Sequence, residues 1–185
     1  MAKSDLIRWG GLAAMGGGVL LIVYNLLALA VGVKVEESSP LDVLVILGYV
    51  LEVVGLVGFH TLQGRNYGGI GRAGLYTSIG ALLVFAFLLV ADLLGGIGNL
   101  VWLNTVGSFG LLGGLLLYGA ATLEARVLPR WCGILFIILW LGSLLLGTLL
   151  LGQSGLIWSG LGWLALGYGL WSHRGAPAEQ PSRVR

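Results

Sequence analysis

The second hydrophobic stretch of the chain, residues 40–62, reads PLDVLVILGYVLEVVGLVGFHTL and places Glu52 near its middle. A helix needs about 20 apolar residues to cross about 30 Å of hydrocarbon at about 1.5 Å per residue. This stretch has that length. In lipid every backbone polar group must be satisfied within its own segment, which a helix achieves and an isolated strand does not. We therefore predict a membrane-spanning helix over residues 40–62.

Stretches of the same kind fill nearly the whole chain. Of the 185 residues, 57% are apolar and only 10% are charged, whereas a soluble domain carries about 25% charged residues. The Leu-, Val- and Gly-rich runs also lack the alternation of a transmembrane β-barrel. We predict an all-α polytopic membrane protein, a compact six-transmembrane-helix bundle within residues 1–174, followed by a disordered cytoplasmic tail over residues 175–185. The predicted spans are residues 6–33, 40–62, 72–94, 99–123, 129–151 and 155–172.

The basic residues predict the orientation of these spans. Nine of the 10 Lys and Arg residues fall on one side of the predicted membrane, and only Lys34 falls on the other. Cytoplasmic loops carry an excess of Lys and Arg. We therefore expect a multi-pass protein of the cell inner membrane with both termini in the cytoplasm.

Short similar motifs open two of the spans. Arg8-Trp9 begins the first span and Arg130-Trp131 begins the fifth, with a reduced version at Arg72 before the third. Three pseudo-repeated helical hairpins would produce this pattern. Independent placement of Arg and Trp at the membrane interface would produce it as well, because both side chains favour that depth.

Two of the links between spans resemble those of a known group of proteins. The Leu128-Pro129-Arg130-Trp131 entry to the fifth span and the Gly- and Arg-rich link over residues 64–72 are similar to those of bacterial six-span inner-membrane proteins of unknown function. The resemblance implies a six-helix membrane protein and no activity.

Small residues recur at four-residue spacing inside the spans. Gly10, Ala14 and Gly18 do so in the first span, and Gly110 and Gly114 in the fourth. Such faces allow helix backbones to approach closely. We expect a tightly packed bundle.

Glu52 is the most informative single residue. A carboxylate in the middle of a bilayer costs at least about 2.5 kcal/mol, so we expect a neutral or paired acid that faces the bundle interior. Its carboxyl is expected within hydrogen-bond reach of a polar group on another helix, such as an indole. The remaining candidates for a ligand or proton site are Tyr49, Asn25, Asp92, Asn104, Trp140 and Trp163.

The sequence lacks the residues that several classes of function require. One cysteine and two histidines offer little for a metal site or redox cofactor, and a net charge of +2 does not suggest nucleic-acid binding. The Gly107-Ser108-Phe109-Gly110 stretch resembles the serine region of rhomboid proteases, but it departs from their Gly-x-Ser-Gly order. The sixth span also has no histidine that could act as the base. We predict no catalytic, metal or cofactor site.

Two function classes remain open from the sequence. The first is a structural, interaction or accessory membrane subunit, with lipid and a membrane protein or a second copy as partners. The second is a small transporter or proton-coupled carrier, with Glu52 at the floor of an outward-facing polar vestibule. A sealed, glycine-packed bundle would favour the first class, and a water-filled outer cavity would favour the second.

Overall fold

The computed structural model describes residues 3–32, 39–64, 66–95, 100–146 and 154–172, and helices are the only regular secondary structure within these ranges. Four helices are long and apolar enough to cross a membrane. The fold is therefore that of an all-helical chain compatible with a multi-pass membrane protein. The helices are α1 (Lys3–Val31), α2 (Asp42–Gln63), α3 (Gly68–Leu93), α4 (Val101–Ala125), α5 (Arg130–Leu146) and α6 (Ser154–Ser172).

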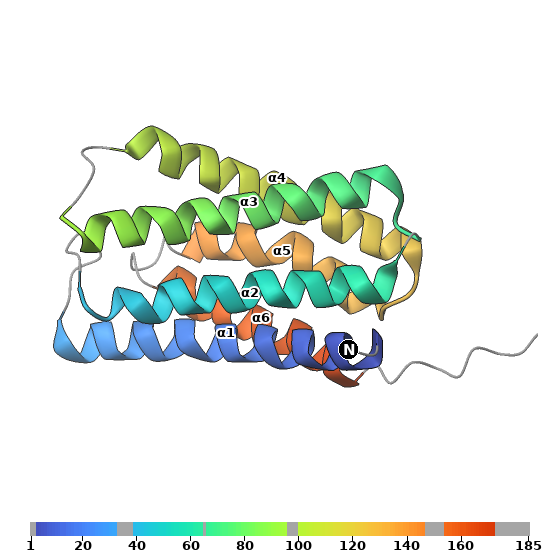
Figure 1. Cartoon of the computed structure of the whole chain (residues 1–185), viewed down its shortest axis with the longest axis horizontal. Coiled ribbons are helices and arrows are strands. Elements are labelled where there is room, and N and C mark those ends of the chain that lie inside the picture. Colours follow the sequence, from blue (N-terminus) through green and yellow to red (C-terminus); the bar gives the residue numbers. More distant parts are fainter. Residues whose placement is uncertain (1–2, 33–38, 65, 96–99, 147–153, 173–185) are drawn as a thin grey trace, which may run out of the picture.

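The helices form a closed ring in sequence order (Figure 1). Each helix packs against the previous and the next one, and α6 returns to pack against α1. Neighbouring helices run in opposite directions, so the start of α1 and the end of α6 lie at the same end of the bundle. This end also holds the links from α2 to α3 and from α4 to α5, and we call it the basic end because Arg8, Arg72, Arg126 and Arg130 lie there.

The helix boundaries lie within a few residues of the predicted spans wherever both ends are described, and the start of α3 differs most. Helix α3 begins at Gly68, four residues before the predicted start, because Gly64 and Gly68 take left-handed backbone angles (φ 61° and 64°) and complete the turn early. Helix α5 ends at Leu146. Residues 147–151 of the fifth predicted span and the tail at 175–185 lie outside the described residues.

A hydrogen-bonded turn over residues 39–42 leads into α2. Ser39 N–H donates to Asp42 Oδ2 at 2.9 Å, and Leu41 N–H donates to Ser39 Oγ at 3.3 Å. The two side chains satisfy backbone groups that the first helical turn leaves unpaired.

Glycines bring α1 against two helices at once. A Cβ added at Gly10 would lie 2.6 Å from Gly58 Cα on α2, and one added at Gly11 would lie 2.9 Å from the Gly167 carbonyl oxygen on α6. The predicted small-residue face of α1 is therefore split, since Gly10 and Ala14 contact α2 whereas Gly18 contacts α6. Adjacent residues on a helix point about 100° apart, so two neighbouring glycines serve two neighbouring helices.

Aromatic side chains fill the centre of the ring. Phe59, Tyr118, Phe136 and Trp163, from α2, α4, α5 and α6, are each at most 1% exposed. Their rings meet edge to face, with Phe136 at 5.1 Å from both Phe59 and Tyr118 and at 6.1 Å from Trp163. This arrangement is favoured by the ring quadrupoles. The axis of the bundle is thus occupied by packed side chains at this level.

Candidate functional site

Glu52 lies in the interface between α1 and α2, as the predicted inward orientation requires. It is 1% exposed, and glycines surround it. A Cβ built at Gly17 would lie 3.1 Å from Glu52 Cγ and 2.8 Å from the Gly48 carbonyl oxygen. The carboxyl therefore occupies a space that exists because α1 carries no side chain at position 17.

The hydrogen-bond partner expected for Glu52 on another helix is not found for Oε1, which bonds to no described residue. The expectation that the Trp163 indole could serve is wrong, because that side chain is packed in the central aromatic cluster against Phe136. The residue facing Glu52 Cγ is a glycine, and a glycine offers no side chain to donate.

A line of polar side chains leads from Glu52 to the start of α2. The Tyr49 hydroxyl interacts electrostatically with the Glu52 carboxyl and with Tyr24 of α1. Tyr24 in turn forms a hydrogen bond with Asp42. Asp42 is 5% exposed and also accepts the Ser39 backbone bond. These residues connect the middle of the α1–α2 interface to the end of the bundle opposite the basic end.

The remaining predicted residues are placed in different surroundings. Asn25 is fully buried on α1. Asp92 and Asn104 are exposed on α3 and α4. The side chain of Trp140 lies outside the described residues. A polar vestibule above Glu52 therefore stays a prediction, with Asp92 and Asn104 exposed on their helices.

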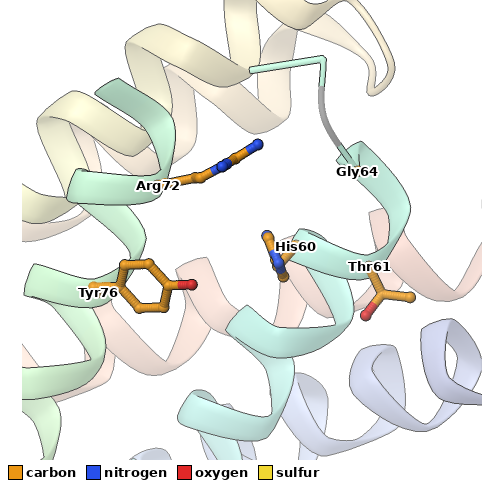
Figure 2. Close-up of a pocket in the computed structure, with 5 residues that line it drawn as sticks. All are labelled: His60, Thr61, Gly64, Arg72 and Tyr76. Atoms are coloured by element: carbon orange, nitrogen blue, oxygen red, sulfur yellow. The ribbon is translucent and has the colours of Figure 1, made fainter. Parts of the chain in front are cut away.

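A second candidate site lies at the basic end, where the sequence did not predict one. An open cleft of about 380 Å³ separates the end of α2 from the start of α3. Figure 2 shows the polar ends of His60, Arg72 and Tyr76 converging on it from these two helices. Thr61 and Gly64 complete the lining.

Tyr67 holds His60 in place beneath this cleft. Tyr67 Oη and His60 Nδ1 share a hydrogen bond, and the two rings meet edge to face at 5.7 Å. Tyr67 also packs edge to face on Tyr118 at 5.8 Å, which ties the cleft to the central aromatic cluster. Burial raises the pKa of the Tyr67 hydroxyl, and the nearby Arg72 guanidinium opposes that shift. The hydroxyl thus remains protonated and available as a donor.

Buried polar groups continue below the cleft. Gln63 Nε2 donates to Thr122 Oγ1 at 2.9 Å and joins α2 to α4. The Thr122 hydroxyl donates to the Tyr118 carbonyl oxygen at 2.8 Å. The signal in the sequence is the placement of His60 and Gln63 before the glycine-rich link and of Arg72 and Tyr76 after it.

No metal centre is formed by the described residues, since no group of three or more His, Cys, Asp or Glu side chains comes together among them. Cys132 is buried and forms no disulfide.

The chain matches no family model, no curated protein and no solved structure. The function must therefore be argued from the two sites themselves.

Proposed function

We propose that this chain is a six-span protein of the cell inner membrane, with both termini in the cytoplasm, that acts as an interaction or accessory subunit. Helices α5 and α6 complete the six spans in this proposal. Four apolar helices of membrane-spanning length support the membrane location. The gathering of arginines at one end of the bundle supports the orientation, because that end would face the cytoplasm.

The single observation that carries the proposal is the filled interior. The side chains at the centre of the ring are at most 1% exposed, and glycine contacts close the α1–α2 and α1–α6 interfaces. A carrier needs a binding site near the bilayer midplane that can open to each side. Packed rings close the axis on the basic-end side of the middle, and glycine contacts close the α1–α2 interface beside Glu52. Together they favour a rigid bundle that presents its outer surface to partners.

The outer surface of α3 supports an interaction role. Gly69, Ala73, Thr77 and Gly80 are exposed on one side of this helix. A Cβ at Gly69 or Gly80 would meet nothing within 4 Å. Small outward residues let another helix approach the backbone closely. The other exposed residues along the membrane helices are mostly large and apolar, which suits contact with lipid.

Photo-crosslinking in native membranes tests the interaction role. A photoreactive residue at Gly80 should give an adduct of discrete mass with a protein partner or a second copy. The matched control is Leu26 on α1, 55% exposed and flanked by large residues, which should give no discrete protein adduct. Identical patterns at the two positions would overturn the proposed role.

The polar line from Asp42 to Glu52 favours a second candidate function, a proton-coupled carrier. Its support is the buried Glu52 carboxyl beside Tyr49 and, beyond it, the Tyr24–Asp42 hydrogen bond. Purified protein in liposomes that enclose a pH-sensitive dye distinguishes the two functions. An interaction subunit should leave an imposed pH gradient to decay as in protein-free liposomes. A faster decay that Glu52→Gln abolishes would establish the carrier instead.

A further inference from the structure

The cleft at the basic end has the composition of an anion site. Its polar lining comes from His60, Thr61, Arg72 and Tyr76, and none of the residues that line it is a carboxylate. Its volume of about 380 Å³ is large enough for a phosphate group with a small substituent. We propose that this cleft binds a phosphoester anion, supplied by the head group of an anionic phospholipid in the adjacent leaflet.

Arg72 provides the charge. It lies on the second turn of α3, and its guanidinium extends across the cleft toward the end of α2 (Figure 2). No carboxylate in the described part of the chain forms an ion pair with it, so the charge is available to a ligand. A guanidinium presents paired N–H donors that match two phosphate oxygens.

His60 and Tyr76 provide further donors in fixed positions. Tyr67 donates to His60 Nδ1 in this proposal, which fixes the tautomer with the proton on Nε2 and leaves that N–H for the ligand. Figure 2 shows the Tyr76 hydroxyl directed toward His60. Thr61 is not a donor to the ligand, because its hydroxyl already donates to the Val57 carbonyl oxygen at 2.8 Å.

The depth of the cleft favours a lipid over a free anion. Three tryptophans at the basic end are exposed, Trp9 by 61%, Trp131 by 42% and Trp171 by 41%. Exposed tryptophans gather at the level of the head groups. Tyr76, which lines the cleft, is 64% exposed, and its ring offers an apolar surface to an acyl chain. A phosphate at Arg72 would thus carry its tails into the bilayer.

The test uses the full chain in detergent, titrated with phosphatidylglycerol or phosphatidylcholine and examined by native mass spectrometry for bound lipid. We expect retention of one phosphatidylglycerol, with affinity lowered about tenfold by Arg72→Gln, which corresponds to the loss of one charge-assisted hydrogen bond. Arg130→Gln is the matched control, because Arg130 is exposed at the same end and does not line the cleft. Arg72→Lys keeps the charge without the paired donors and should lower the affinity by a smaller factor.

Inorganic phosphate and glycerol phosphate form the second arm of the test. If either displaces phosphatidylglycerol at low millimolar concentration, the phosphoester site stands and a free anion is its source. If neither does, the lipid is the source. Equal losses in Arg72→Gln and Arg130→Gln would overturn the site, since binding would then follow the charge of the whole end. Equal retention of phosphatidylcholine and phosphatidylglycerol would overturn it as well. Native mass of the lipid-free protein and its thermal unfolding show whether each variant is folded.

Discussion

Replacing Glu52 by Met should stabilise the protein. Glu52 is 1% exposed, and its Oε1 bonds to no described residue. A buried polar group without a partner costs about 1–3 kcal/mol, and a shape-matched apolar replacement removes that cost. Glu and Met have nearly equal helix propensities, so the local helix term cancels. We expect the free energy of unfolding to rise by about 1–3 kcal/mol.

The choice of Met follows from the geometry at Gly17. A Cβ added at Gly17 would lie 3.1 Å from Glu52 Cγ, so this carbon faces α1, and a Leu, which branches at it, would crowd that helix. Met is unbranched and adapts its terminal atoms to irregular space. Glu52→Gln is the control, because the amide leaves polar atoms in the same position and should not stabilise.

The measurement is unfolding of the purified protein in mild detergent with increasing sodium dodecyl sulfate, followed by tryptophan fluorescence. The reasoning would be refuted if Glu52→Met lowered the free energy of unfolding by about 1 kcal/mol or more while Glu52→Gln matched the wild type. That pattern is the signature of a hydrogen bond that the amide keeps and the thioether loses.

Four further substitutions test the packing and the turn before α2. Tyr118→Phe should raise the free energy of unfolding by about 1 kcal/mol, because the buried Tyr118 hydroxyl bonds to no described residue; a loss of stability would show that it has a partner. Gly114→Ala should destabilise by several kcal/mol, since its Cβ would lie 2.7 Å from Ser78 N and 2.9 Å from the Gly74 carbonyl oxygen. A Cβ added at Gly113 would meet nothing within 4 Å, so Gly113→Ala should be neutral or slightly stabilising in the same assay. Equal changes of stability in Gly114→Ala and Gly113→Ala would contradict the α3–α4 contact at Gly114. Ser39→Ala should cost about 0.5–1.5 kcal/mol through the lost hydrogen bond from Leu41 N–H to Ser39 Oγ, and an unchanged melting temperature would argue against that bond.

Local signals account for the parts of this fold that the sequence predicts. Apolar stretches of membrane-spanning length correspond to the described helices, and the burial of Glu52 follows from the chemistry of one side chain. The position and length of a helix depend on residues that are close in the sequence, so they can be predicted without knowledge of the fold.

Helix pairing accounts for what the sequence does not predict. Asp92 and Asn104 are predicted members of one site with Glu52, yet both are exposed on α3 and α4, whereas Glu52 is buried against α1. Depth along a span can be read from residue number, but the direction in which a side chain faces depends on which helices become neighbours. The cleft at His60 and Arg72 was missed for the same reason, because its residues come from two helices and meet only after the link has turned.

The position of Glu52 links its chemistry to motion of α1. Its neighbours Gly48 and Gly55 pack against Leu21 and Ala14 of α1, and Gly17 covers its Cγ. Glu52 is 1% exposed, so exchange of a proton with bulk water requires a path beside Tyr49 or a separation of α1 from α2. Glycines of α1 also pack closely against α6. A separation of α1 from α2 would therefore open the α1–α2 interface while the α1–α6 interface stays packed. A rigid subunit keeps both interfaces closed, whereas a carrier must open one of them in each transport cycle. The stability of the α1–α2 interface is therefore the physical quantity that distinguishes the two functions.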